Sequence, residues 1–391
     1  MTITNLRALR NTLDIEVVKS SCFGNNFLIY DGTEEGILEE VHFAEFARQV
    51  TDPQFGIGAD NFLVIQNCNE AELQVTNSVH GYWKKIPKIS ADYVFRMFEP
   101  DGQEALCCGN GLMCIANYMS ERHQVETARI MTEIPLATVN VTTIGFTKSK
   151  SYGWVNLGIP RRLPAEIRTQ APSDGSVGEI QTINNLRIKF RSHDLEPYLR
   201  DTELVLSGHL IFTGEPHLVF LLDDEDSPLA ELADAIFAYK EGNQGAGPLL
   251  QRRCGFGTWL VDHIGQYINT HYRDRFPAGV SVNFVRKDQS NSSIEYRCYE
   301  RGVYKETLAC GTGAVAVAYI VDQFLGYEGS AIKVLPHRCR WFKPHALMAV
   351  NNTKDGWILE GQPDIVAEIG FRFEPHSNRA EYLPQQNVNQ L

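Results

Sequence analysis

Two short segments of the chain place a cysteine and two glycines at the same spacing, each directly before an apolar stretch of helical length. They are Cys108-Gly-Asn-Gly111 and Cys310-Gly-Thr-Gly313. A thiol at a helix start lies against backbone N–H groups without an intrahelical acceptor and against the positive end of the helix dipole, which lowers the pKa of the thiol. Glycines let backbone amides approach a ligand closely enough to hold a carboxylate. Each segment therefore predicts a proton-transferring thiol, Cys108 or Cys310, beside a site for a carboxylate.

The two segments belong to a longer internal repeat. Residues 95–111 and 296–313 both read as a strand, a tight turn, a glutamate four residues before a cysteine, and a helix start. A second match, between residues 24–30 and residues 214–220, lies upstream in the same order. Two copies of one domain plan that meet about a pseudo-twofold axis would put the two cysteines on opposite walls of one cleft. Two thiols on opposite sides of a carbon can invert an α-amino acid without a cofactor, because one removes a proton and the other returns one.

Other interpretations of these residues explain less of the pattern. A cysteine beside glycines is often only a small core residue, but the repetition of the whole segment favours catalysis. Residues 311–316 follow a dinucleotide-binding fingerprint, but the βαβ unit that this fingerprint needs is missing. His217 is expected to be a turn residue and not a base. No Cys-x-x-Cys pair occurs, so no metal site is expected, and the other cysteines are expected to be structural: Cys22, Cys68, Cys107, Cys114, Cys254, Cys298 and Cys339.

The elements that must position the two segments indicate an α+β fold. Most of the chain consists of short β-branched or aromatic runs separated by glycine and proline, with few long helices. Helical spacing predicts helices over residues 38–50, 112–119 and 314–324. The stretches 160–205 and 223–275 mix polar residues with glycine and proline, so we expect insertions on the surface there.

Length and composition are those of an ordinary globular chain. The 391 residues suit two domains. Hydrophobic residues make up 43% and charged residues 21%, which argues against disorder, collagen and coiled coil. No apolar run is long enough for a transmembrane helix, and the first residues lack the apolar stretch of a secretory signal.

Charge and cysteine content narrow the partners further. The chain has 36 basic and 48 acidic residues, and this net charge of −12 argues against nucleic acid as the main partner. Nine cysteines without a disulfide pattern favour free thiols in a reducing, cytoplasmic setting. We therefore expect a cytoplasmic protein with a small amino-acid substrate and no nucleic-acid or membrane partner. The sequence leaves a homodimer open.

Motifs along the whole chain resemble, in order, those of the diaminopimelate epimerase family. The resemblance runs from about residue 13 to residue 372, and the chain exceeds a typical member mainly in 68–92, 160–210 and 223–275. The motifs are Gly24-Asn-Asn-Phe27, Gly56-Ile-Gly-Ala-Asp-Asn61, Asp101-Gly with Cys108-Gly-Asn-Gly111, Gly214-Glu-Pro-His217, Phe276-Pro with Asn283-Phe, Tyr299-Glu-Arg-Gly302, Ala309-Cys-Gly-Thr-Gly313 and the closing segment 360–367.

The resemblance implies a pyridoxal-independent amino-acid racemase or epimerase that uses no cofactor. It implies two pseudo-symmetric α+β domains, each a curved sheet or barrel around a central helix, with the active site between them. The first domain would span 13–153, completed by a strand at about 362–391, and the second would span 154–361. Cys108 and Cys310 would be the acid/base thiols.

The resemblance also implies a substrate-binding set. Backbone groups of the two helix starts would hold the α-carboxylate, and a group of polar side chains would place the reacting centre and its ammonium. Arg301 would reach the distal part of the substrate. The helix-start residues are Gly109, Asn110, Gly311 and Thr312, and the polar group is Asn25, Asn61 and Glu300.

Three positions depart from the family's substrate-binding asparagines: they are Glu99, Glu215 and Ser281 here. In the family those amides recognise the distal amino-carboxylate end, together with the arginine. A carboxylate about 5 Å from a substrate carboxylate costs roughly 3 kcal/mol at an effective dielectric constant of about 20. The replacements therefore favour a cationic or polar substrate side chain, unless both glutamates turn toward Arg301 or backbone amides. Diaminopimelate epimerase proper and a non-catalytic amino-acid-binding protein stay open as alternatives, whereas phenazine-type isomerases lack the cysteine pair.

Overall fold

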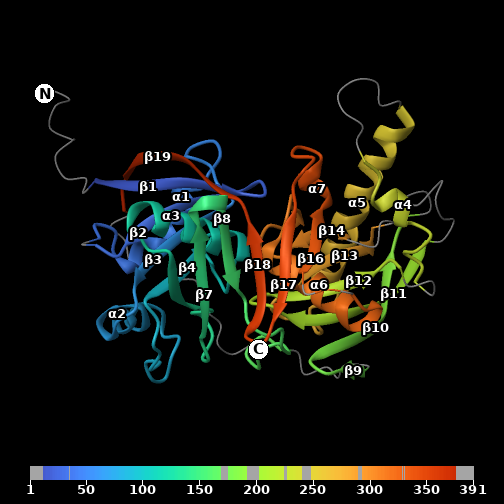
Figure 1. The fold of residues 1–391 in the computed structure, drawn as a ribbon, viewed down its shortest axis with the longest axis horizontal. Helices are drawn as coiled ribbons and strands as arrows, with labels where there is room; N and C mark the ends of the chain where they lie inside the picture. Colours follow the sequence, from blue (N-terminus) through green and yellow to red (C-terminus); the bar gives the residue numbers. More distant parts are fainter. Residues whose placement is uncertain are drawn as a thin grey trace, which may run out of the picture.

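The computed structural model describes residues 12–34, 36–168, 175–191, 202–223, 227–239, 248–288, 293–327, 329 and 331–375. These residues form two halves that lie side by side along the long axis of the molecule, with β8 (Tyr152–Asn156) and β18 (Gly356–Gly361) between them (Figure 1). Within the described residues, no helix is both long and apolar enough to cross a membrane.

Each half is built on the same series of strand pairings. From the outer strand toward the centre, the pairings are antiparallel, antiparallel, parallel, antiparallel, parallel, antiparallel and antiparallel. The two series join where β8 pairs with β18, with Trp154 opposite Glu360. The first half runs through β19 (Pro363–Phe373), β1 (Leu13–Cys22), β2 (Asn25–Gly32), β3 (Asn61–Asn67), β4 (Tyr93–Phe98), β6 (Thr127–Thr132), β7 (Asn140–Thr147) and β8. The second half runs through β10 (Ile180–Lys189), β11 (Glu203–Phe212), β12 (Pro216–Leu221), β13 (Ser281–Lys287), β14 (Ser293–Glu300), β16 (Ala331–Pro336), β17 (Met348–Thr353) and β18.

A long buried helix lies at the centre of each half: α3 (Gly109–Arg122) and α6 (Gly311–Leu325). All but the last two residues of α3 are buried, because β1, β2, β6, β7 and β8 surround it. The α6 sequence is apolar on every side, as a helix enclosed by a sheet requires. The predicted fold class, an α+β fold of two pseudo-symmetric halves around central helices, is confirmed. Both helices are longer than predicted because each begins at the glycine that directly follows the cysteine.

The shorter elements connect the strands of the two halves or cover their sheets. The helix predicted over residues 38–50 begins later, because a 3-10 turn η2 (Glu40–His42) precedes α1 (Phe43–Val50). The remaining elements are α2 (Glu70–His80), η3 (Lys148–Lys150), α4 (Ala233–Ile236), α7 (His337–Arg340), and the short strands β5 (Glu104–Ala105), β9 (Gly175–Val177) and β15 (Lys305–Glu306).

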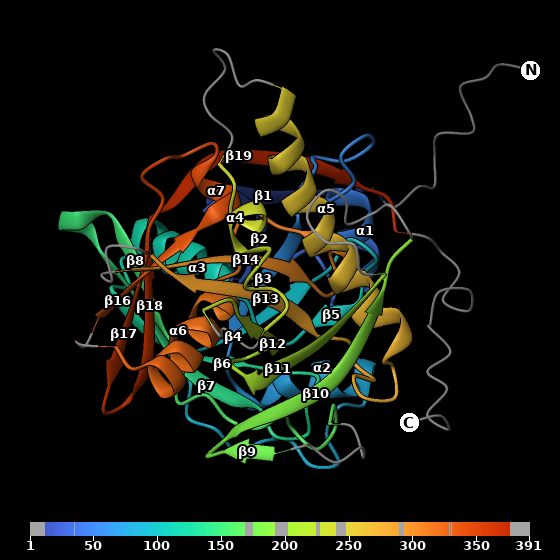
Figure 2. The same ribbon diagram turned by 90° about the vertical axis from the view of Figure 1, so that its right-hand side faces the viewer.

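The prediction that 160–205 and 223–275 are surface insertions is wrong for their described parts. The second stretch contains α5 (Pro248–His271), which lies over β13 and β14 (Figure 2). Glycines that suggested a loop in fact permit this packing: a Cβ at Gly257 would lie 2.4 Å from Arg297 Nη1, and a Cβ at Gly265 would lie 2.1 Å from Tyr299 Cγ. One core combines apolar residues of both stretches: Ile183, Leu186 and Ile188 with Leu260, Val261, Ile264 and Ile268.

The strand order bears on the predicted domain limits. β19 pairs with β1 and so returns the chain to the first half after β18. The predicted boundary between residues 153 and 154 falls inside β8, which continues the first-half series. Residues 376–391, the last part of the predicted completing strand, and the side chain of Cys254 lie outside the described residues.

A buried arginine–glutamate pair ties the strand before each cysteine to the turn that follows it. The Arg96 Nε donates to Glu104 Oε1 at 2.5 Å, and the Arg297 Nε donates to Glu306 Oε1 at 2.5 Å. In both pairs the Nη2 donates to the other carboxylate oxygen at 2.6 Å. Both guanidinium groups are fully buried, so these are bidentate, charge-assisted pairs away from water.

Two segments by which the chain exceeds a typical family member, 68–92 and 223–275, contact these arginine–glutamate pairs. In the first half, the Tyr82 hydroxyl donates to Glu104 Oε2 at 2.8 Å. In the second half, α5 provides Thr258 Oγ1, which accepts from Arg297 Nη2 at 2.8 Å, and Asp262 Oδ1, which accepts from the Glu306 amide at 2.5 Å. The segments 68–92 and 223–275 therefore contact equivalent points beneath the two cysteine turns.

Candidate active site

The two cysteine segments meet at the centre of the molecule. Cys108 is the N-cap of α3 and Cys310 is the N-cap of α6. Each sulfur accepts a hydrogen bond from the amide of the third helical residue, from Gly111 at 3.3 Å and from Gly313 at 3.4 Å. The first two amides of each helix have no intrahelical acceptor, which leaves two positive helix ends in one place.

The first glycine of each motif is needed for contact between the two helix starts. A Cβ on Gly109 would lie 2.9 Å from Leu359 Cδ2 and 3.2 Å from the Gly311 carbonyl carbon. A Cβ on Gly311 would lie 2.8 Å from the Asn110 amide nitrogen. These two glycines therefore let the helices approach each other, whereas the sequence suggested that they let a ligand approach.

A cavity of about 400 Å³ opens between the helix starts. Of the residues predicted to transfer protons or bind substrate, only Gly109 does not line it. Those that do are Cys108, Cys310, Asn25, Asn61, Glu99, Asn110, Glu215, Ser281, Glu300, Arg301, Gly311 and Thr312. The lining also includes polar residues that were not predicted, among them Asp60, Asn269, Arg273, Tyr304 and Thr307. Asn269 and Arg273 come from the stretch predicted to be a surface insertion, where no motif pointed to them.

The two thiols do not share one electrostatic environment. The pKa of Cys310 is lowered, chiefly by the neighbouring Cys298 thiol, and also by Thr312 and the Gly313 amide, against the effect of burial. Desolvation raises the pKa of Cys108 well above its usual range, and the single amide donor from Gly111 does not offset it. The prediction that a helix start lowers both pKa values is therefore wrong for Cys108.

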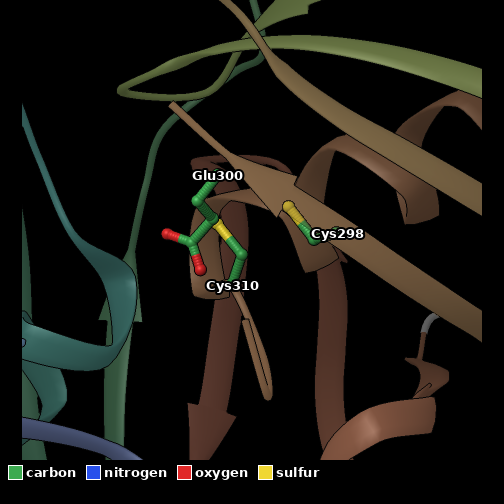
Figure 3. Close-up of side chains that lie close together, drawn as sticks. All are labelled: Cys298, Glu300 and Cys310. Atoms are coloured by element: carbon green, nitrogen blue, oxygen red, sulfur yellow. The ribbon is translucent and has the colours of Figure 1, made fainter. Parts of the chain in front are cut away.

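Cys298 was predicted to be a structural cysteine, but it lies beside Cys310 (Figure 3). Its sulfur, the Cys310 sulfur and a Glu300 carboxylate oxygen are all within 4.8 Å of one another. The signal in the sequence was strand alternation, because Cys298 and Glu300 are two residues apart on β14 and share a face.

His217 orients a residue of the second helix start. It is fully buried in β12, and burial lowers its pKa to about 3, so it is neutral and not a general base. The Asn283 amide Nδ2 donates to His217 Nδ1 at 3.1 Å, which leaves the proton on Nε2. Nε2 then donates to Thr312 Oγ1 at 3.0 Å, and the Thr312 hydroxyl can donate to the Cys310 sulfur at 3.5 Å. The expectation of a turn residue is wrong, although the view that His217 is not a base agrees with its burial.

Glu215 and Arg301 form an ion pair. Arg301 Nε donates to Glu215 Oε2 at 2.6 Å, and Arg301 Nη1 donates to the Ala278 carbonyl at 2.9 Å. The other Glu215 oxygen accepts from the amides of Leu106 at 3.0 Å and Cys107 at 3.3 Å. Glu215 is therefore the glutamate that turns toward the arginine and toward backbone amides.

Glu99 forms no ion pair with a cation among the described residues, and Arg301 only partly offsets the factors that raise its pKa. Its Oε2 accepts from Asn61 Nδ2 at 2.8 Å. Desolvation, followed by repulsion from Glu215 and Glu300, raises the pKa of Glu99 to about 8. In the free site at neutral pH this carboxyl is mostly protonated, so the wall of the cavity carries less negative charge than the sequence suggests.

Hydrogen bonds also hold other predicted residues around the cavity, and one of them, from Asn110 to Ala309, joins the two halves. Asn110 Nδ2 donates to Asn25 Oδ1 at 2.6 Å and to the Ala309 carbonyl at 3.3 Å. Ser281 Oγ accepts from the Arg301 amide at 3.2 Å. These contacts fix the side chains around the cavity before any substrate binds.

The arrangement matches known proteins in sequence and in fold. The family model for diaminopimelate epimerase matches residues 17–149. A diaminopimelate epimerase of Methanothrix thermoacetophila is 28% identical over 82% of this chain and 85% of its own length. Another, of Archaeoglobus fulgidus, is 29% identical over 80% of this chain and 82% of its own. The chain is therefore similar to diaminopimelate epimerases over about four fifths of its length.

Solved structures share the fold of this chain at low sequence identity. A hydroxyproline epimerase from Agrobacterium vitis, with bound trans-4-hydroxy-L-proline, superposes with a TM-score of 0.56 at 12% identity and covers 94% of this chain and 95% of its own. A probable proline racemase from Agrobacterium radiobacter, with bound carbonate, has a TM-score of 0.53 at 12% identity and covers 93% and 94%. The similarity to these epimerases indicates an isomerase of the racemase and epimerase class.

Proposed function

We propose that the protein inverts the α-carbon of a free amino acid by moving protons between that carbon and two thiols, Cys108 and Cys310. The observation that carries this proposal is that both cysteines cap helix starts that line one cavity. A carbon held between the sulfurs loses its proton to a thiolate on one side and gains one from a thiol on the other, which inverts its configuration. This chemistry needs no cofactor.

The helix starts would hold the α-carboxylate. Asn110, Gly311 and Thr312 line the cavity at two positive helix ends. Those ends stabilise a bound carboxylate, and they stabilise it further when proton removal adds negative charge at the neighbouring carbon. Asn25, Asn61 and Glu300 are the candidates for placing the reacting centre and its ammonium group.

The substrate side chain would be cationic or polar. Arg301 Nε and Nη1 already donate to Glu215 and to a carbonyl, so Glu215 neutralises the arginine and leaves only part of its donors for a distal substrate carboxylate. Glu99 is a desolvated carboxyl at the cavity that forms no ion pair among the described residues, and the nearby Arg301 only partly offsets its raised pKa. A cationic side chain would supply the missing charge and gain charge-assisted hydrogen bonds. We expect a preference over diaminopimelate of at least about tenfold, or about 1.4 kcal/mol.

The reaction is tested by screening free L-amino acids, diaminopimelate included, for exchange of the α-proton in deuterium oxide. The substrates are then ranked by kcat/KM of the compounds that exchange. The companion variant Glu99→Asn/Glu215→Asn/Ser281→Asn restores the family's amides and should shift selectivity toward diaminopimelate. If the natural protein prefers diaminopimelate, the substrate assignment is wrong and the two-thiol proposal still stands. If no amino acid exchanges its α-proton, the reaction itself is wrong.

A further inference from the structure

The two sulfurs at the cavity accept different sets of hydrogen-bond donors. Cys108 accepts from the Gly111 amide at 3.3 Å. Cys310 accepts from the Gly313 amide at 3.4 Å and lies 3.5 Å from the hydroxyl of Thr312. In the first half the position of Thr312 is taken by Asn110, whose Nδ2 donates to other acceptors.

A second difference lies on the strand before each turn. Cys298 of β14 lies opposite Asn283, as Met97 of β4 lies opposite Leu63, so Cys298 and Met97 are equivalent residues of the two halves. Cys298 brings an S–H group within 4.8 Å of the Cys310 sulfur. A methionine has no proton to donate, so the first half offers Cys108 nothing comparable at this position.

We propose that Cys298 is a positioning residue that acts with Thr312 to hold negative charge on the Cys310 sulfur, so that the enzyme without substrate carries a Cys310 thiolate and a Cys108 thiol. This inference rests on the proposed two-thiol function. It goes further by stating which of the two sulfurs is ionised before substrate binds. It also assigns roles, because the enantiomer whose α-proton faces Cys310 then reacts with the enzyme in its resting form.

Titratable groups face Cys310 from every element around it. β14 contributes Tyr296, Cys298 and Glu300, the loop before β12 contributes Glu215, and the start of α3 contributes Cys108. Tyr296 is a neutral phenol that exchanges hydrogen bonds with the Cys310 backbone at 2.8 Å.

Glu300 is the group that could oppose a thiolate at Cys310, because its carboxyl lies within 4.8 Å of the sulfur. Desolvation, followed by the nearby Cys310, raises the pKa of Glu300 well above its usual range. This raised pKa favours the protonated form of Glu300 next to a charged Cys310, so that the buried pair would carry one negative charge. The lowered pKa of Cys310 agrees with this distribution.

Alkylation with a thiolate-selective reagent distinguishes the effect of ionisation from the effect of solvent exposure at the two cysteines. Cys108 is the more exposed of the two, whereas Cys310 is 7% exposed. Access alone would therefore favour labelling of Cys108, and charge favours Cys310. Iodoacetamide is applied to the intact protein without substrate over a range of pH, and peptide mapping gives the rate at each cysteine, with Cys68 as an internal reference. We expect Cys310 to react at least about tenfold faster than Cys108 at neutral pH.

Substitutions at Cys298 then test the positioning role. Cys298→Met copies the first half and should move the midpoint of Cys310 alkylation upward by about one pH unit, or about tenfold in rate at neutral pH. Cys298→Ser retains a donor and should restore much of the natural midpoint. Faster labelling of Cys108, or an unchanged midpoint in a folded Cys298→Met protein, overturns the proposal. Because the readout does not need turnover, it separates failure of this inference from failure of the proposed function.

Discussion

Glu99 and Glu300 occupy equivalent positions in the two halves, each at the cavity end of an equivalent strand, β4 or β14. Desolvation raises the pKa of both, to about 8 for Glu99 and well above the usual range for Glu300. Repulsion from Glu215 and Glu300 adds to the desolvation of Glu99, so the free site disfavours a negative charge on Glu99. A bound cation changes this balance, which makes the ionisation of Glu99 a probe of the substrate.

Binding of a cationic side chain should depend on pH through Glu99. Below pH 8 the carboxyl is mostly neutral, so its ionised fraction, and with it the affinity for lysine or ornithine, rises about ninefold from pH 6 to pH 7 and about fivefold more to pH 8. KM should therefore fall as pH rises over this range. Glu99→Gln should flatten the profile, and a KM that stays constant from pH 6 to pH 8 in the natural protein would rule out this role.

Both thiols should be required for inversion. Cys108→Ala and Cys310→Ala each remove one proton carrier, and each should lower kcat/KM by roughly 10³-fold. Cys68→Ala is the matched control, because Cys68 is a free thiol that does not line the cavity. Near-normal racemisation by either active-site variant is the outcome that the two-thiol assignment does not survive.

Contact between the helix starts should make Gly311 intolerant of a side chain. In Gly311→Ala the added Cβ meets the Asn110 backbone nitrogen at 2.8 Å, so we expect a loss of about 1–3 kcal/mol in unfolding free energy. Gly370→Ala adds a Cβ with no atom within 4 Å and should change stability by less than about 0.5 kcal/mol. Urea unfolding of both variants measures this, and equal stability would show that the helix starts do not touch.

The buried pair under the second cysteine turn should matter far more than an exposed pair. Glu306→Gln leaves the Arg297 charge buried without its partner and should cost about 3–5 kcal/mol in stability. The exposed pair of Arg372 with Asp14 offers a control, and Arg372→Gln should cost less than about 1 kcal/mol. Comparable losses in the two variants would mean that burial does not govern the strength of these pairs.

Much of the site could be predicted because the chemistry repeats along the chain. The two Cys-Gly-x-Gly segments indicated the helix starts, a fold of two pseudo-symmetric halves and a shared cavity. The difference in pKa between the two thiols could not be predicted, because it depends on Cys298 and Thr312 both lying near the Cys310 sulfur in the folded chain. Neither the desolvation of Cys108 nor the pairing of Glu215 with Arg301 follows from spacing alone.

The error over 223–275 has a similar physical cause. Gly257 and Gly265 suggested loops, since glycine lowers helix propensity. In the structure both lie inside α5, where the absence of a Cβ lets the helix contact Arg297 and Tyr299 of β14. Close packing decided the local structure there, and a single sequence does not reveal the neighbour that requires it.

The isotopic course of the reaction tests the central claim most directly. One enantiomer of the preferred amino acid is converted in deuterium oxide, and product and remaining substrate are analysed at low conversion. Two thiols on opposite faces predict that the product carries deuterium at the α-carbon while the recovered substrate still carries hydrogen. Equal early labelling of substrate and product would mean that one base exchanges its proton on a single face, and would contradict the account.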